Sequence, residues 1–205
     1  MHNPYGFKIN PKFKHFDFSR DHLPTVVKDT LDKTNLNILE VGVEYGGYLD
    51  IYYPQFEDVT EKFYLVDLWQ TEGNDDHFTK YEDRVEQGYK RVKELYGKNP
   101  KIKMCKGSSV DKSKDFDDEF FDYIYIDADH TKKAVLEDLK AWYPKVKKGG
   151  IIAGHDTYCD PNNISYEFFD VEGALEEFFT EEQQEQIHLT NEYAYKTWVY
   201  IKSEE

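Results

Sequence analysis

Five short apolar runs in the first three quarters of the chain constrain the fold more than any other feature. They cover residues 37–41, 63–66, 101–105, 121–126 and 151–154, and most of them end at a glycine or an acidic residue. Runs of this length that stop at turn residues are typical of buried strands. Segments with apolar residues at helical spacing lie between several of them, at Val85, Tyr89, Val92 and Tyr96 and at Val135, Leu139, Trp142 and Val146.

This alternation predicts right-handed βαβ units and a parallel sheet with helices on both faces. Residues 186–190 and 197–202 add two strand patterns joined by a short link, which indicates a hairpin. We therefore expect an α/β fold with a single Rossmann-like, doubly wound, seven-stranded, mostly parallel sheet and a C-terminal antiparallel hairpin strand.

The length of 205 residues favours one folded domain. Residues 1–35 are predicted to form an N-terminal leader with a short helix, which Asp21 would cap and in whose first turn Pro24 would lie. Residues 36–205 would then form the ligand-binding domain.

The chain is acidic, with 41 aspartate and glutamate residues, 26 lysine and arginine residues and a formal charge of −15. This charge argues against nucleic acid and anionic membranes as partners, because both attract clustered basic residues. Aromatic residues make up 17% of the chain, which argues against disorder. Two cysteines, no signal sequence and no apolar run long enough to span a membrane favour a cytoplasmic protein.

Four acidic residues stand at the predicted carboxyl ends of strands: Glu40, Asp67, Asp127 and Asp156. Ligands of doubly wound sheets bind at this edge. We therefore expect part of the negative charge to lie in a binding site.

A glycine-rich loop, with Gly42, Gly46 and Gly47, follows the first strand and carries Glu44 inside it and Glu40 before it. A nicotinamide oxidoreductase, the main alternative on this fold, would require the spacing G-x-G-x-x-G and a loop that accepts pyrophosphate. Two carboxylates disfavour pyrophosphate and favour an ammonium or sulfonium group. An ordinary tight turn is the simpler interpretation of the glycines alone.

Asp67 ends the second strand, where an adenosine ribose presents its two hydroxyl groups in folds of this kind. A carboxylate can accept both hydrogen bonds. Taken without the loop, a solvated acidic residue would be the better interpretation, but together the two features favour ribose binding.

These motifs resemble class I S-adenosylmethionine-dependent methyltransferases, and most closely the O-methyltransferases of methyltransferase family 24, which include macrocin-type sugar O-methyltransferases. The matching segments lie between residues 36 and 202, and the most specific pair is Asp127-Ala128-Asp129-His130 with Gly149-Gly150 and His155-Asp156. The resemblance implies that Glu40 and residues 42–47 hold the methionine end of S-adenosylmethionine, that Asp67 holds the ribose, and that Ser108 and Ser109 contact the adenine. It also places Asp127 at the edge of the cofactor site. Both serines are equally plausible as turn residues.

Asp127, Asp129 and His130 leave one strand, and His155 and Asp156 leave the next. Oxygen and imidazole groups suit magnesium or manganese. By similarity to metal-dependent O-methyltransferases, the ligands would be Asp127, His155 and Asp156, although those enzymes usually have an acidic residue where His155 stands. The alternative is that His155 and Asp156 orient the acceptor without a metal.

Two residues are candidates for the general base. Asp129 stands where sugar-type relatives have a catalytic acid, and His130 has the side chain most often used for proton transfer near neutral pH. His130 could instead cap the following helix.

The expected acceptor is a small hydroxylated molecule, with a sugar or glycan unit favoured, and a homo-oligomer is possible. Residues 157–170 are expected to form a lid over the acceptor. Candidates for its walls are Tyr45, Trp69, His77, Tyr158, Tyr166, Phe168 and Phe169, although most of them are better explained as ordinary core or rim residues. A non-catalytic module that binds S-adenosylmethionine is the remaining alternative.

Overall fold

The computed structural model describes residues 10–69, 79–157 and 169–204, and the side chains of residues 79–84 lie outside that description. Its strands are β1 (Lys14–His15), β2 (Leu36–Val41), β3 (Thr60–Asp67), β4 (Ile102–Lys106), β5 (Phe121–Ile126), β6 (Val146–Thr157), β7 (His188–Leu189) and β8 (Lys196–Ile201). Its α-helices are α1 (Leu23–Leu31), α2 (Gly47–Phe56), α3 (Thr79–Tyr96), α4 (Ser109–Ser113), α5 (Lys132–Trp142), α6 (Val171–Phe178) and α7 (Glu181–Gln184).

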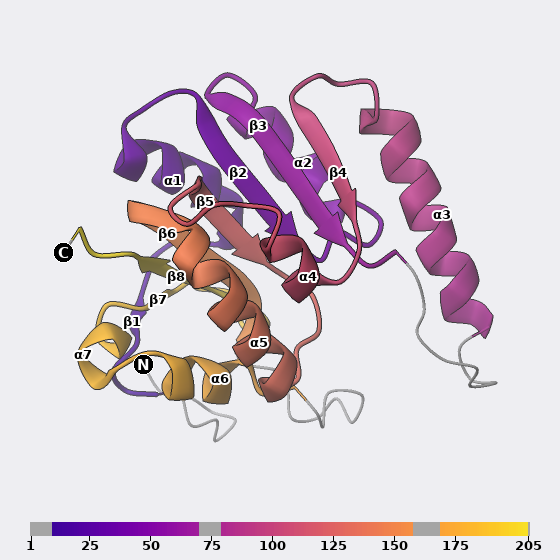
Figure 1. Ribbon diagram of the computed structural model, residues 1–205. Coiled ribbons are helices and arrows are strands. Elements are labelled where there is room, and N and C mark those ends of the chain that lie inside the picture. Colours follow the sequence, from indigo (N-terminus) through magenta and orange to yellow (C-terminus); the bar gives the residue numbers. More distant parts are fainter. Residues whose placement is uncertain (1–9, 70–78, 158–168, 205) are drawn as a thin grey trace.

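The strands form one eight-stranded sheet in the order β1-β7-β8-β6-β5-β2-β3-β4 (Figure 1). Strands β2 to β6 are mutually parallel, and β8 runs antiparallel to both β6 and β7. The predicted fold class, including the C-terminal hairpin, is confirmed. The described residues contain eight strands rather than seven, because two leader residues pair with β7 as β1.

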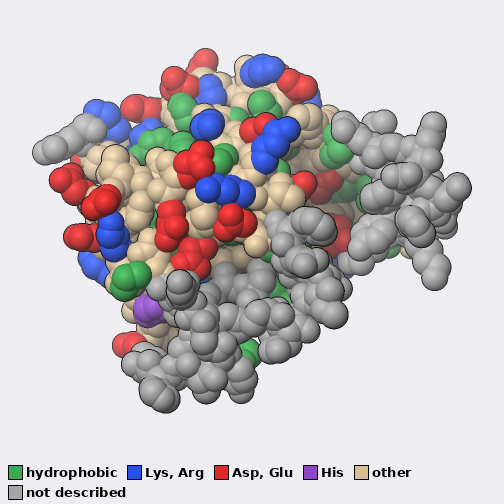
Figure 2. Space-filling model, turned by 90° about the horizontal axis from the view of Figure 1, so that it is seen from below, with side chains coloured by type: hydrophobic (Ala, Val, Ile, Leu, Met, Phe, Trp, Pro, Cys, Tyr) green, Lys and Arg blue, Asp and Glu red, His purple; other side chains and the backbone are tan. Residues whose placement is uncertain are grey.

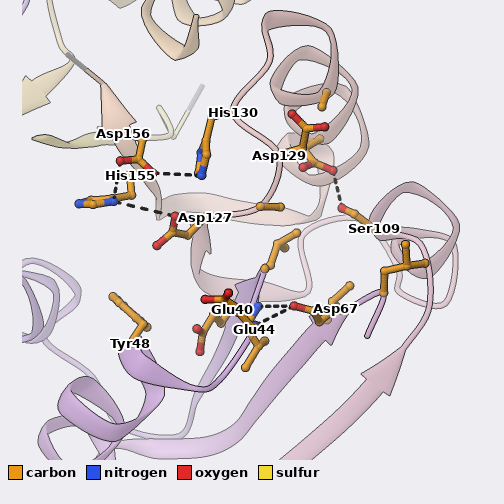
Figure 3. Close-up of a pocket in the computed structure, with 18 of the residues that line it drawn as sticks. Glu40, Glu44, Tyr48, Asp67, Ser109, Asp127, Asp129, His130, His155 and Asp156 are labelled. Atoms are coloured by element: carbon orange, nitrogen blue, oxygen red, sulfur yellow. Dashed lines mark hydrogen bonds and ion pairs between the residues drawn. The ribbon is translucent and has the colours of Figure 1, made fainter. Parts of the chain in front are cut away.

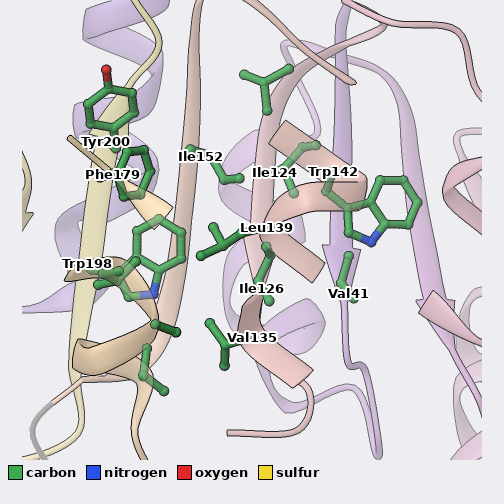
Figure 4. Packing of buried hydrophobic residues seen from close by; sticks show 14 of the residues in the cluster. Val41, Ile124, Ile126, Val135, Leu139, Trp142, Ile152, Phe179, Trp198 and Tyr200 are labelled. Carbon is green, nitrogen blue, oxygen red and sulfur yellow. The ribbon is translucent and has the colours of Figure 1, made fainter. Parts of the chain in front are cut away.

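Helices cover both faces of the sheet (Figure 1). Side chains of α1, α2 and α3 pack on one face with Ile38 and Leu65. Side chains of α5 and α6 pack on the other face with Leu39 and Ile124. Figure 4 shows this second cluster, in which Leu139 and Trp142 of α5 face the sheet. Every residue of β5 is buried, as expected for a central strand covered on both sides.

The strand order reverses between β2 and β5. From β2 the chain continues outward to β3 and β4, whereas β5 leads to β6 on the other side. Loops at the carboxyl ends of these two strands therefore diverge and leave a crevice, which is where ligands bind in such sheets.

Two local predictions need correction. The residue before α1 that serves as its N-cap is His22, because Asp21 lies inside a 3-10 turn, Arg20–His22. Val146 belongs to β6, because α5 ends at Trp142 and a second 3-10 turn, Tyr143–Lys145, follows. None of the described helices is both apolar enough and long enough for a membrane span.

Asp122 ties the amino ends of β2 and β5 together. Its side chain is 2% exposed, accepts the backbone N–H of Asn37 at 2.8 Å, and pairs with Lys33 at 2.7 Å and Lys147 at 2.9 Å. Burial alone would raise the pKa of Asp122, but these hydrogen bonds and charges outweigh it and lower that pKa.

Asp122→Asn should therefore lower the free energy of unfolding at neutral pH by about 2 kcal/mol, since a buried charged acceptor loses its ionic partners. The loss should shrink as the pH falls through the lowered pKa of the folded state, where wild-type Asp122 also becomes neutral. Urea unfolding at several pH values measures it. Asp118→Asn is the matched control, because Asp118 pairs with Lys145 but is 70% exposed, so its change should stay below about 0.5 kcal/mol. Equal effects of the two variants would contradict this account.

Candidate active site

A cavity of about 1080 Å³ opens at the carboxyl edge of the sheet. The predicted site residues that line it are Glu40, Gly42, Glu44, Gly47, Asp67, Ser108, Ser109, Asp127, Asp129, His130, His155 and Asp156. Figure 3 shows Glu40, Asp67, Asp127 and Asp156 converging from the ends of β2, β3, β5 and β6. Gly46 is not among the lining residues.

The glycine loop connects β2 to α2, and its backbone packs closely against the end of β5. Gly42 has a φ of +86°, and a Cβ there would lie 2.1 Å from the carbonyl oxygen of Asp127. Gly46 has a φ of +82° and precedes α2. Both positions thus require glycine, for backbone conformation and, at Gly42, for space. A Cβ on Gly47 would meet no atom within 4 Å, so the first turn of α2 faces open space.

Asp67 holds the glycine loop in place. One carboxylate oxygen accepts the backbone N–H groups of Val43 and Glu44, both at 2.8 Å, and the other accepts the N–H of Trp69 at 2.6 Å. Figure 3 shows the two hydrogen bonds from the loop to Asp67 as dashed lines. Asp67 therefore has a structural role that the sequence did not indicate, in addition to its place at the cavity wall.

Glu40 is 1% exposed, and its Oε2 atom has no hydrogen-bond partner among the described residues. Burial, and then the charges of Asp127, Asp67 and Asp50, raise the pKa of Glu40 well above its usual value. A buried carboxyl oxygen without a donor is costly, unless a ligand supplies one. Because Glu40 also lines the cavity, it marks a place for a cationic or donor group.

Ser109 sits in a network rather than pointing freely into the cavity. Its hydroxyl donates to Asp138 and accepts the indole N–H of Trp142 at 2.8 Å. Burial raises the pKa of Asp138 to about 6. Ser108 precedes α4 without a side-chain cap and also lines the cavity.

A second group of side chains gathers at the ends of β5 and β6. Ligand atoms of Asp127, His130 and Asp156 all lie within 4.8 Å of one another. His130 Nε2 is 3.1 Å from Asp156 Oδ2. Burial and the charge of Asp156 raise the pKa of Asp127, although His155 counters them. Burial alone would also raise the pKa of Asp156, but the hydrogen bond from His155 and the nearby positive groups together lower it. The two carboxyl groups are thus shifted in opposite directions.

His155 is fixed between this group and the N-terminal leader. Its Nε2 atom lies 2.7 Å from Nη1 of Arg20, and its Nδ1 atom lies 3.2 Å from Asp156 Oδ1 and 3.9 Å from Asp127 Oδ1. Arginine only donates, so Nε2 must accept and the ring proton must be on Nδ1. In this arrangement His155 donates toward the carboxylates.

Asp129 and the aromatic residues predicted for the acceptor pocket differ in whether they lie at the cavity. Asp129 is exposed, and its Oδ1 accepts the N–H of Thr131 at 2.8 Å, which forms a turn before α5. The Phe169 ring lies 4.5 Å from that of His130. Trp69 and Tyr45 are not among the lining residues, and Trp69 is buried against Tyr89. His77, Tyr158, Tyr166, Phe168 and most of the expected lid, 158–168, lie outside the described residues.

Sequence comparison decides the family. Residues 39–157, more than half of the chain, match methyltransferase family 24, a family described as a methyltransferase domain. The chain belongs to this methyltransferase family. The prediction of a class I S-adenosylmethionine-dependent methyltransferase is therefore confirmed at the level of the family. A search among curated proteins gives no match.

Solved structures confirm the methyltransferase fold. An O-methyltransferase family protein from Burkholderia thailandensis has a TM-score of 0.59 at 9% identity, over 90% of this chain and 56% of that one. The CurJ carbon methyltransferase gives 0.61 at 12%, over 90% and 54%. Spermidine synthase in complex with the transition-state analogue AdoDATO gives 0.52 at 16%, over 92% and 60%. The chain thus spans little more than half of these longer proteins, and their differing names show that the fold alone does not fix the acceptor.

The residues present fit the methyl donor of this methyltransferase family. The unpartnered Glu40 oxygen can accept from an ammonium group, and the open space at Gly47 admits a ligand close to the backbone. The Asp127, His130 and Asp156 set also has the composition of a divalent-cation site, with two carboxylates and one imidazole. This set contains His130 in place of the expected His155, whose Nε2 is engaged by Arg20.

Several residues of the methyltransferase site gave no signal in the sequence. Arg20 and Tyr52 line the cavity, but one lies in the leader outside the family match and the other on α2, with no motif around it. Arg91 of α3 donates to the carbonyl of Tyr45 at 2.6 Å and to Asp50 at 2.5 Å. It therefore stabilises the glycine loop without lining the cavity. Such roles depend on packing between distant segments.

Gly42→Ala and Gly47→Ala should separate folding from binding. The methyl group at residue 42 would collide with backbone in a left-handed conformation, and we expect about 3 kcal/mol or more of destabilisation. At residue 47 the added methyl should change stability by less than about 1 kcal/mol, because alanine favours helices and nothing is nearby.

Gly47→Ala should nevertheless weaken S-adenosylmethionine binding, because the methyl group would occupy space at the start of α2. Urea unfolding and calorimetric titration on both variants measure the two effects. A Gly47→Ala protein with wild-type affinity would show that the cofactor does not approach this turn.

Proposed function

We propose that this chain transfers a methyl group from S-adenosylmethionine to a hydroxyl oxygen of a small acceptor, with a sugar or glycan unit favoured. The observation that carries the proposal is the buried, unpartnered Glu40 oxygen beside an open glycine loop. A sulfonium cofactor with an ammonium group suits an acidic cavity of this kind, whereas the pyrophosphate of a nicotinamide cofactor does not. The family match favours the same choice.

We further propose that Glu40 accepts a hydrogen bond from the ammonium group of the methionine end and that Asp67 faces the ribose hydroxyls. The two oxygens of Asp67 already accept three N–H groups, but each carboxylate oxygen can accept more than one bond. Glu44 and Gly47 would lie along the same end of the cofactor. The adenine would lie near Ser108 and Ser109.

The reaction would be an in-line displacement. The acceptor oxygen forms a bond to the methyl carbon while the carbon–sulfur bond breaks, and the electron pair stays on sulfur as S-adenosylhomocysteine leaves. The hydroxyl proton must pass to a base. His130, held by Asp156 at 3.1 Å, can take it when no cation is bound. Asp129, which also lines the cavity, is the base if His130 is a metal ligand.

A divalent cation such as magnesium or manganese would be held by Asp127, His130 and Asp156. When bound, it would lower the pKa of the acceptor hydroxyl and relieve the repulsion between the two carboxylates. Such a role accounts for three ligand atoms gathered within 4.8 Å. The acceptor would lie between this group and the methyl group of the cofactor.

Glu40→Gln should weaken S-adenosylmethionine binding by roughly a hundredfold, because a charge-assisted hydrogen bond is lost. The free variant should be at least as stable as the wild type at neutral pH, since a buried carboxyl group with a raised pKa disappears. Isothermal titration calorimetry measures the affinity for S-adenosylmethionine, and urea unfolding measures the stability. Glu57→Gln, on the exposed end of α2, is the control. Unchanged affinity in Glu40→Gln would remove the proposed cofactor position.

Chelation with EDTA should abolish methyl transfer to a panel of hydroxylated acceptors, while calorimetric binding of S-adenosylmethionine stays unchanged. Manganese or magnesium should restore turnover. Full turnover in EDTA would remove the metal and leave His130 as the base, and His130→Ala would then be inactive. Binding of S-adenosylmethionine without turnover on any acceptor would instead support a non-catalytic module.

A further inference from the structure

Arg20 differs in charge from everything around it in the cavity. It is the single arginine or lysine among the described residues that line the cavity, where the other ionisable groups are acids, tyrosines and histidines. Arg20 comes from the leader, in the 3-10 turn before α1, and lies outside the family match. Arg20 therefore reaches the cavity from a segment outside the matched domain.

Hydrogen bonds to the backbone of Arg20 and of the residues just before it fix the position of this segment. The N–H of Arg20 donates to a carboxylate oxygen of Glu192, and the neighbouring Asn191 donates to the carbonyls of Phe18 and Asp17. These contacts attach the leader to the link between β7 and β8. The side chain is thus directed from a fixed backbone.

The guanidinium group of Arg20 retains donors for a ligand. Its Nη1 atom bonds to the neutral acceptor Nε2 of His155, and among the described residues it takes part in no ion pair with a carboxylate within 4.0 Å. The hydroxyl of Tyr125 also interacts with it, and the charge of Asp127 acts on it from beyond ion-pair distance, so several of its N–H donors stay available. A guanidinium has five N–H donors in a planar fork that matches a carboxylate or a phosphate.

Tyr52 supplies a second, independent observation. Its side chain is 1% exposed, its residue lines the cavity, and its hydroxyl has no hydrogen-bond partner in the described part of the chain. Burial raises the pKa of Tyr52, and the nearby positive charge of Arg20 opposes that shift, so the two groups are neighbours. A buried hydroxyl donor beside a cation is satisfied by an anionic acceptor.

We propose that Arg20 and Tyr52 form a subsite for an oxyanion of the acceptor, a carboxylate or a phosphate group. This inference rests on the proposed methyl transfer and narrows its substrate class. One imidazole ring, that of His155, separates the guanidinium from Asp156 and Asp127. The hydroxyl that is methylated and the acidic group would therefore lie a few bonds apart, as in a hydroxy acid, a sugar acid or a sugar phosphate.

Side-chain NMR of the full chain tests the subsite with simple probes. Acetate and inorganic phosphate are titrated separately while the Arg20 and His155 nitrogen signals are followed, and acetamide is the uncharged control of the same shape as acetate. At least one anion should give a saturating shift and acetamide none. Whichever of the two binds more tightly identifies the acidic group.

Substitutions at Arg20 and Tyr52 test whether these two residues bind the anion. Arg20→Gln should abolish the saturating response, followed on His155, and Tyr52→Phe should weaken it roughly tenfold without lowering stability, because its hydroxyl has no partner to lose. Lys90→Gln removes the same charge from an exposed ion pair with Glu86 and should keep wild-type affinity. No saturating shift with either anion, or the same shift in Arg20→Gln, would overturn the subsite.

Calorimetric binding of S-adenosylhomocysteine separates the two proposals. Cofactor binding without an anion response would overturn the subsite alone. An anion response without cofactor binding would overturn the proposed methyl transfer and would still support the anion subsite.

Discussion

The close approach of the glycine loop to the end of β5 is the contact on which the whole site depends. Gly42 lies against the backbone of Asp127 with no room for a side chain, and Asp67 holds the next two N–H groups of the loop. This arrangement brings Glu40 and the first turn of α2 beside the carboxylates of β5 and β6. Without it, the proposed cofactor region and the proposed proton-transfer region would lie in separate places.

Electrostatics divide the cavity into parts with different preferences. Many of the described acidic side chains lie on the surface, where Figure 2 shows them intermixed with lysine and arginine over one face. Two of the strand-end acids are different, because burial raises the pKa of Glu40 and of Asp127, and a cationic partner would stabilise their charged forms. Arg20 adds a positive group at one wall. A positively charged methyl donor and an acidic acceptor would be complementary to this pattern.

Local sequence was sufficient to predict the strands, the hairpin and the place of the strand-end acids, because buried parallel strands have a simple apolar pattern and their carboxyl ends must share one edge. Helix α2 gave no such signal, since Pro54 stands inside it and tyrosines dominate its buried face. The pairing of leader strand β1 with β7 joins residues far apart in the chain and has no local pattern.

The sequence was sufficient to predict which residues form the candidate site, but not which of them form hydrogen bonds and ion pairs with one another. All of the residues predicted for the cofactor, the metal and the base line the cavity, except Gly46. Only the three-dimensional packing shows which nitrogen of His155 faces Arg20 and that Ser109 donates to Asp138. It also shows that His130, as well as His155, lies beside the two carboxylates. Spacing in the sequence identifies the edge of the sheet, whereas side-chain orientation decides the partners.

A crystal structure of the full chain with S-adenosylhomocysteine tests the central claim most directly. The account predicts the ammonium group within hydrogen-bond distance of the Glu40 oxygen that has no partner among the described residues, the ribose beside Asp67, and the sulfur directed toward Asp127 and His130. A complex in which the ligand lies elsewhere and the Glu40 oxygen stays unpaired would contradict it.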